Sequence, residues 1–202
     1  LVVAPTSVVG VWIDQARTFT PHLRVRAVTE TATRRGTTIG EEVADADIVV
    51  TSYTLARLEA KQWNQVHLGG VVIDEAQAVK NPRTATYRAL RDLESPWKLA
   101  VSGTPIENSL GDLWSLLSLT CPGLLPPWET FQQEVRRPIE NGADPAMLGR
   151  LTAYVAPFVL RRTKEEVAPD LPDKIVDIVR VELGKEHRHI YDQYLARERA
   201  RI

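Results

Sequence analysis

The sequence predicts an α/β protein with a parallel β-sheet, followed by a mainly helical segment. Through about residue 120, short apolar runs that suit β-strands alternate with helical patterns, which is typical of a parallel sheet. The predicted strands are almost continuously apolar, as expected where helices cover both faces of a sheet. After Cys121-Pro122-Gly123 the alternation stops. We therefore expect one α/β domain over residues 1–120 and a helical region over residues 121–202.

Five strands are predicted in the first domain. They cover residues 1–4, 24–29, 47–50, 70–73 and 97–101. The segments between them carry apolar residues at helical spacing, so helices are expected to connect the strands. The carboxyl ends of parallel strands meet at one edge of the sheet, where proteins of this class bind their ligands.

Helix starts are predicted from capping residues. Thr6 or Ser7 can cap the helix after the first strand, because a hydroxyl accepts hydrogen bonds from the free N–H groups of a first turn. Asn81-Pro82 is typical of a helix start, because proline at the first helical position gives up no needed donor. The expected core-facing residues of three helices are Val9, Trp12, Ile13 and Ala16, then Tyr87, Leu90 and Leu93, then Leu110, Leu113, Trp114 and Leu117.

Composition and charge exclude several classes of protein. The net charge of −1 gives no general attraction to nucleic acid, so any such binding must use a local patch. Cys121 is the single cysteine, so we expect neither an internal disulfide nor a thiolate metal site. No apolar run is long enough to span a bilayer, so no membrane partner is expected. These features favour a cytoplasmic protein.

Both ends of the sequence resemble cut ends. The chain begins without Met inside an apolar strand, and it closes in a helical pattern that has no stop signal before Ile202. We therefore expect a piece of a longer protein.

The run Asp74-Glu75-Ala76-Gln77 follows the fourth predicted strand. Adjacent carboxylates at this edge of a parallel sheet suit phosphoryl-transfer chemistry. Asp74 can hold Mg²⁺ through its water shell, and Glu75 can orient and deprotonate an attacking water. The same two residues also suit the N-terminus of a helix, which favours acidic side chains. Taken alone, the four residues leave both interpretations open.

The surrounding sequence resembles the Swi/Snf class of helicase superfamily two nearly from end to end. Residues 71–82 resemble the Walker B region, and residues 99–117, which include Ser102-Gly103-Thr104-Pro105, resemble motif III and the helix after it. Leu1-Val2-Val3-Ala4-Pro5-Thr6-Ser7 resembles motif Ia, and Val50-Thr51-Ser52-Tyr53 resembles motif Ib. Residues 158–167, followed by Leu171-Pro172-Asp173-Lys174, resemble the helical insertion of the class.

The resemblance implies the first RecA-like lobe of a DNA-dependent ATPase that uses ATP and Mg²⁺. It gives Glu75, Asp74 and Gln77 catalytic roles, with Mg²⁺ held by Asp74 through water. Gln77 departs from the commoner His, but its amide both donates and accepts. Ser102, Gly103 and Thr104 would couple the nucleotide site to the second motor lobe, and their hydroxyls can bond to Gln77. Without the resemblance, Ser102-Gly103-Thr104 is better interpreted as a tight turn.

The resemblance also implies contacts to one strand of double-stranded DNA. The expected DNA-binding residues are Pro5, Thr6, Ser7, Thr51, Ser52 and Tyr53, with Arg161 and Arg162. Hydroxyls and amides at helix N-termini suit phosphate oxygens, although the same hydroxyls can simply cap the helices. For the two arginines a structural role is at least as well supported, since neighbouring Glu165 and Glu166 dilute their charge.

No P-loop pattern of glycines followed by Lys and Ser or Thr occurs in these residues. In the class it precedes motif Ia, so the lobe is expected to be truncated before the P-loop. We expect this piece alone to be inactive, with a central strand lost and a sheet edge exposed.

Three functions fit the sequence. The leading hypothesis is an ATP-dependent translocase on double-stranded DNA that displaces or remodels bound protein. The alternatives are an RNA- or DNA-unwinding helicase of the same superfamily and a non-catalytic partner-binding module. The Ala- and Arg-rich composition favours a bacterial source. In a bacterium the candidate partners are RNA polymerase or repair complexes, and the protein would be associated with the nucleoid. A eukaryotic protein of this kind would be nuclear.

Overall fold

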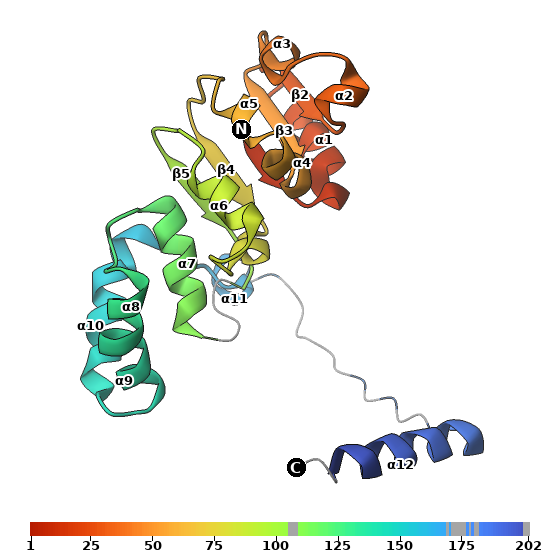
Figure 1. Ribbon diagram of the computed structural model, residues 1–202, viewed down its shortest axis with the longest axis vertical. Helices are drawn as coiled ribbons and strands as arrows, with labels where there is room; N and C mark the ends of the chain where they lie inside the picture. Colours follow the sequence, from red (N-terminus) through yellow and green to blue (C-terminus); the bar gives the residue numbers. More distant parts are fainter. Residues whose placement is uncertain (105–108, 169, 171–176, 178, 180–181, 200–202) are drawn as a thin grey trace. The chain divides into compact units, whose positions relative to one another are not determined.

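The computed structural model describes residues 1–104, 109–168, 170, 177, 179 and 182–199. The chain divides into two compact units, Leu1–Val159 and Leu160–Ile202. In the described residues of the first unit, five parallel strands form one sheet in the order β2-β3-β1-β4-β5 (Figure 1). They are β1 (Val2–Ala4), β2 (Val25–Val28), β3 (Ile48–Ser52), β4 (Val71–Asp74) and β5 (Lys98–Val101). The predicted parallel α/β fold is confirmed.

Helices connect the strands, and a helical hairpin follows the last one. The helices between and after the strands are α1 (Val9–Phe19), α2 (Ala32–Arg35), α3 (Ile39–Val43), α4 (Tyr53–Leu58), α5 (Ala60–Trp63), α6 (Ala85–Arg91) and α7 (Leu110–Thr120), with 3₁₀ turns η1 (Thr6–Val8) and η2 (Ala76–Val79). The hairpin contains α8 (Trp128–Phe131), a π-helical turn η3 (Gln132–Arg136), α9 (Arg137–Glu140), α10 (Pro145–Val155) and the 3₁₀ turn η4 (Ala156–Phe158). The second unit contains α11 (Lys164–Val167) and α12 (Lys185–Arg199).

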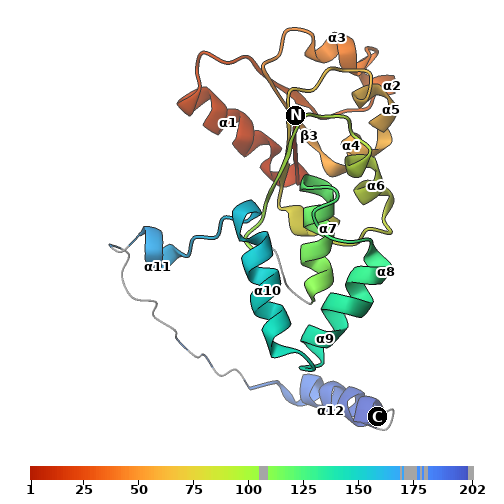
Figure 2. The same cartoon turned by 90° about the vertical axis from the view of Figure 1, so that its left-hand side faces the viewer.

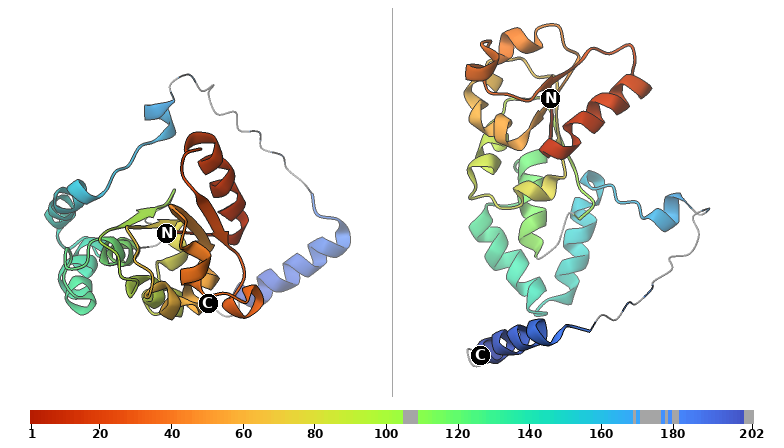
Figure 3. Two further views of the ribbon diagram at one scale, coloured as in Figure 1. Left: turned by 90° about the horizontal axis from the view of Figure 1, so that it is seen from above. Right: turned by 90° about the vertical axis from the view of Figure 1, so that its right-hand side faces the viewer.

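Helices cover both faces of the sheet, as the apolar strands predict. Val2 and Val50, which are paired in register, pack with Val9 of α1 on one face. On the other face, Val3 and Ile73 belong to a larger buried cluster that α3 to α7 complete. Figure 2 shows α1 on one side of the strands and α4 to α6 on the other, and the view from above in Figure 3 agrees.

Two helix starts differ from the prediction. Neither Thr6 nor Ser7 caps α1: the chain makes the turn η1 first, in which Val8 N donates to Pro5 O at 3.0 Å, and α1 begins at Val9 without a side-chain cap. The helix predicted from Asn81-Pro82 begins three residues later. Asn81 Oδ1 instead accepts from Arg83 N at 3.0 Å, which is a local turn, and Thr84 Oγ1 caps α6 by accepting from Tyr87 N at 3.2 Å.

Helix α7 joins the sheet to the helical hairpin. Leu116 and Leu119 belong to the buried cluster of the sheet, whereas Leu113 and Leu117 pack with Phe131 of the hairpin. The predicted boundary near residue 121 falls at the end of α7, the first helix after the last strand, β5. The compact units divide after Val159, because α7 buries residues in both clusters.

The sheet has no gap at its centre, because β1 pairs with both β3 and β4. The expected loss of a further strand together with the P-loop stays a prediction. An edge strand does expose apolar side chains: Leu99 and Val101 of β5 are 52% and 43% exposed. Leu99 is in register with Val72, so its side chain lies on the same face of the sheet as α1. Helix α1 packs mainly over β2 and β3, at the other end of the sheet from β5. In the described residues, no helix is long and apolar enough to cross a membrane.

Candidate functional site

The parallel strands bring the predicted motifs to one edge of the sheet. Strands β1, β3, β4 and β5 all end there, and the residues that follow them are Pro5–Ser7, Tyr53, Glu75–Gln77 and Ser102–Thr104. Residues from four separate parts of the sequence therefore surround the carboxyl end of β4. This is the edge at which open parallel sheets bind ligands.

The Asp74 carboxylate is held from two directions. Its Oδ1 accepts from the backbone N of Glu75 at 2.9 Å, and its Oδ2 accepts from Trp12 Nε1 of α1 at 2.7 Å. A carboxylate oxygen can accept more than one hydrogen bond, so both oxygens keep capacity for a further ligand. Asp74 is half-buried, which leaves that capacity accessible.

Glu75 has an unusual backbone conformation. Its φ of 50° and ψ of 50° lie in the left-handed region, and among the described residues it is the only non-glycine with positive φ. A left-handed non-glycine residue carries strain and persists only where its surroundings hold it. Tyr53 supplies one such restraint, since its hydroxyl donates to Asp74 O at 2.5 Å and lies 3.3 Å from Glu75 O.

Tyr53 stays protonated and can serve as this donor. Burial raises the pKa of its phenol, and the nearby negative charges of Asp74 and Glu75 raise it further. The Tyr53 hydroxyl is turned inward to the backbone of the carboxylate pair, and a contact between Tyr53 and DNA stays a prediction.

Gln77 links the carboxylate pair to the end of β5. Its Nε2 donates to Glu75 Oε2 at 2.7 Å, and its Oε1 accepts from Ser102 Oγ at 2.7 Å. Ser102 Oγ in turn accepts from Thr104 N at 3.2 Å. The predicted hydrogen bond between motif III and Gln77 is thus present. It comes from Ser102, and Gly103 is exposed beside it. Pro105–Asn108, also part of the predicted motif, lie outside the described residues.

The two predicted DNA-binding segments of the first unit differ in accessibility. Thr6 and Ser7 are exposed and cap no helix, so their hydroxyls are open to a phosphate. Thr51 is fully buried, and its Oγ1 donates to Val28 O at 2.9 Å. Ser52 is 7% exposed and caps α4, with its Oγ accepting from Leu55 N at 3.3 Å. The hydroxyls of Thr51 and Ser52 are therefore engaged within the fold, and a contact between this segment and DNA stays a prediction.

The remaining predicted site residues belong to the second unit. Arg161 and Arg162 are exposed there, just before α11. Their roles stay predictions. Leu171–Lys174, which complete the predicted helical insertion, lie outside the described residues.

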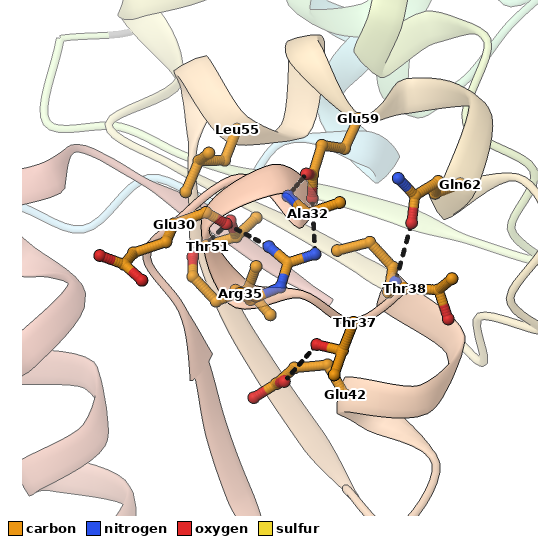
Figure 4. Close-up of polar contacts among 12 residues, drawn as sticks. Glu30, Ala32, Arg35, Thr37, Thr38, Glu42, Thr51, Leu55, Glu59 and Gln62 are labelled. Atoms are coloured by element: carbon orange, nitrogen blue, oxygen red, sulfur yellow. Dashed lines mark hydrogen bonds and ion pairs between the residues drawn. The ribbon is translucent and has the colours of Figure 1, made fainter.

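A buried ion pair near the carboxyl ends of β2 and β3 was not expected from the sequence (Figure 4). Arg35 Nη2 and Glu59 Oε2 are 3.0 Å apart, with side chains 8% and 6% exposed. Glu59 also accepts from Ala32 N, and Arg35 donates to Glu30 O. The pair thereby ties α2 to α4 and the start of α5. Arg and Glu are also common in surface segments, so the local sequence gives no signal that these two side chains are buried as a pair.

A match to a family model decides the classification of the chain. The model of the SNF2-related domain matches residues 1–202. The chain belongs to the SNF2-related family.

Named relatives of this SNF2-related chain occur in bacteria and in yeast. The putative ATP-dependent helicase/translocase YwqA of Bacillus subtilis (strain 168) is 36% identical over 195 residues, which are 96% of this chain and 21% of that protein. The TATA-binding protein-associated factor MOT1 of Saccharomyces cerevisiae is 32% identical over 210 residues, 98% of this chain and 11% of that protein. The chain thus spans about a fifth and about a tenth of these relatives.

Solved structures carry the same fold. The Sulfolobus solfataricus SWI2/SNF2 ATPase core in complex with dsDNA matches with a TM-score of 0.73 and 38% identity, over 86% of this chain and 36% of that one. A second structure, the Sulfolobus solfataricus SWI2/SNF2 ATPase core domain, matches with a TM-score of 0.71 and 35% identity, over 97% of this chain and 40% of that one. The SNF2-related chain therefore has the RecA-like fold that its sequence predicts.

The side chains at this site of the SNF2-related chain suit a Mg²⁺ ion that the phosphates of a bound substrate also coordinate. Among the described residues, no group of three or more His, Cys, Asp or Glu side chains lies together as a metal cage. Mg²⁺ in nucleotide sites is usually held by one or two carboxylates, water and substrate phosphates. Asp74 fits that pattern, since one oxygen accepts from Trp12 Nε1 and the other from Glu75 N, and each can accept further.

Proposed function

We propose that the protein is an ATP-dependent motor that moves along double-stranded DNA and displaces or remodels bound protein. The observation that carries the proposal is the hydrogen-bonded series from Ser102 through Gln77 to Glu75. Such a series connects a carboxylate suited to activate water with the strand end that would face a second motor lobe. A binding module would need no such connection.

Within this proposal, Glu75 and Asp74 have different roles in ATP hydrolysis. Glu75 is exposed, and its Oε2 accepts from Gln77 Nε2, so the carboxylate can still orient and deprotonate a water. Asp74 would hold Mg²⁺ through water, and the ion would neutralise charge on the phosphates of ATP. Tyr53 and Trp12 hold the carboxylate pair in place.

Double-stranded DNA is the proposed track. The exposed hydroxyls of Thr6 and Ser7 lie at the same sheet edge as Asp74, and they suit phosphate oxygens without reading bases. The structure of the SWI2/SNF2 core with dsDNA, which has this fold, supports DNA as the ligand. In a bacterial cytoplasm the displaced protein would be RNA polymerase or a repair complex.

Comparing nucleic acids tests the proposal. We expect ATP hydrolysis by the full-length protein to rise at least about tenfold with duplex DNA, and far less with single- or double-stranded RNA. The salt dependence of DNA binding should be steep and independent of sequence, because phosphate contacts dominate it. Greater stimulation by RNA would favour an unwinding helicase, and DNA binding without hydrolysis would favour a binding module.

Ser102→Ala tests the link between the strand end and the carboxylate. The substitution removes the hydroxyl that donates to Gln77 Oε1, so Gln77 loses the contact that orients its amide toward Glu75. We expect the DNA-stimulated rate to fall about tenfold, the effect of roughly 1.4 kcal/mol, while DNA affinity changes less than about twofold. Steady-state hydrolysis and DNA-binding titrations measure the two.

Ser102→Thr is the matched control, because it keeps the hydroxyl and should retain most of the stimulated rate. Equal losses in the alanine and threonine variants would contradict a role for the hydrogen bond.

A further inference from the structure

Trp12 follows the Pro5–Ser7 segment proposed to contact DNA, and it makes a polar contact of its own with Asp74. The residue lies on α1, and its ring packs against the apolar cluster that contains Val2 and Val50. Its Nε1 donates to Asp74 Oδ2 at 2.7 Å across 62 positions of the sequence. Helix α1 therefore reaches the proposed Mg²⁺ carboxylate directly.

The chemistry of indole suits it to hold a metal-binding carboxylate. The indole N–H is a donor and has no lone pair for a metal, so it cannot compete with Asp74 as a ligand. A hydrogen bond to an ionised carboxylate is shorter and stronger than one between neutral groups. Because Glu75 N occupies the other oxygen, the two donors together fix the plane of the carboxylate and leave it free to meet a hydrated ion.

Partners of this kind tune metal sites elsewhere. Groups that donate to a ligating side chain fix its orientation, and their removal weakens metal affinity or activity by about 10- to 100-fold. The backbone N–H of Glu75 cannot be removed by ordinary mutation, whereas the N–H of Trp12 can. Trp12 is thus the part of this arrangement that can be tested.

We propose that Trp12 is a positioning residue that orients the Asp74 carboxylate for Mg²⁺–nucleotide binding. The inference rests on the proposed function, since it concerns the same site. It gives α1 a role in nucleotide binding in addition to the proposed DNA contact of the turn that precedes it.

Trp12→Phe in the full-length protein tests the proposal. Phenylalanine keeps an aromatic ring in the apolar cluster and removes the N–H donor. We expect the Mg²⁺ concentration that gives half-maximal binding of a fluorescent ATP analogue to rise about tenfold or more. The same shift should appear in the Mg²⁺ dependence of hydrolysis, with a smaller change in kcat at saturating Mg²⁺.

Trp114→Phe is the matched control. Trp114 Nε1 donates to Pro126 O at 2.9 Å in the helical hairpin, so this variant also loses one indole hydrogen bond and one ring. Its Mg²⁺ requirement should match that of the wild-type protein. Equal Mg²⁺ requirements of the Trp12 and Trp114 variants would overturn the inference, whereas nucleotide binding without any DNA-stimulated hydrolysis in the wild-type protein would overturn the proposed function.

A spectroscopic measurement covers the case in which Trp12→Phe does not fold. In protein labelled with ¹⁵N-tryptophan, Asp74→Asn should move the indole N–H signal of Trp12, because the acceptor loses its charge, and leave that of Trp114 in place. An unmoved Trp12 signal would contradict the contact on which the inference depends.

Discussion

Glu75→Gln in the full-length protein is expected to lower DNA-stimulated ATP hydrolysis by about 10²- to 10⁴-fold, the usual contribution of a general base. The glutamine carbonyl can still accept from Gln77 Nε2, as Glu75 Oε2 does at 2.7 Å, so the turn that holds residue 75 should persist. The substitution therefore removes the basic carboxylate and keeps its surroundings. ATP affinity should change little, because Asp74 remains to share the metal.

Single-turnover hydrolysis and binding of a fluorescent nucleotide separate these two effects. Glu94→Gln is a suitable control, since Glu94 is an exposed carboxylate that precedes β5, at the opposite end of the strands from Asp74. It should leave both quantities unchanged. A Glu75 variant that hydrolyses ATP at the wild-type rate would exclude Glu75 as the base.

Glu59→Ala is expected to lower the local free energy of unfolding around α2 to α5 by about 3–5 kcal/mol, the usual cost of removing one partner from a buried ion pair. Arg35 would be left buried with its charge unpaired, and the N–H of Ala32 would lose its acceptor. Arg35 Nε already lacks a hydrogen-bond partner in the described residues, so little compensation is available nearby. Hydrogen exchange of the backbone amides in this region measures the change.

The exposed pair Arg17–Asp14 provides the comparison. Its atoms are 3.5 Å apart and its side chains are 74% and 76% exposed, so Asp14→Ala should cost at most about 1 kcal/mol. Replacing Arg35 and Glu59 together by apolar residues of similar volume should restore much of the stability that Glu59→Ala loses. Equal effects of Glu59→Ala and Asp14→Ala would show that the buried pair contributes no more than a surface pair.

The sheet and the Gln77–Ser102 contact could be predicted because they depend on regular backbone geometry. Four strands were predicted from mainly apolar runs and β2 from alternation, and each begins and ends within two residues of its predicted range. Parallel strands end at a common edge, and β4 pairs directly with β5, so residues just beyond the two strands meet. The helix starts at Thr6 and Asn81 could not be predicted as well, since nearby turns compete for the same hydrogen bonds.

The contacts of Trp12 and Tyr53 depend on how α1 and α4 are rotated against the sheet, which local sequence does not determine. Thr51 is in register with Val3 and lies inside the sheet. Alternation along β3 could not have identified it as buried, because Val50 on the other face and Ser52 beside it are buried as well.

The two-sided burial of α7 has a mechanical consequence. The helix packs on β5, which Ser102 follows, and on η2, which contains Gln77. Its leucines on the other side pack against the hairpin of α8 to α10. Densely packed interiors transmit displacement because they have little room to deform. A force that displaces the hairpin would therefore displace α7. The displacement of α7 would in turn distort the hydrogen bonds around Gln77. If the protein is the proposed motor, strain on this hairpin would reach the proposed catalytic carboxylate of Glu75 through α7 and Gln77, by a route that does not include the DNA.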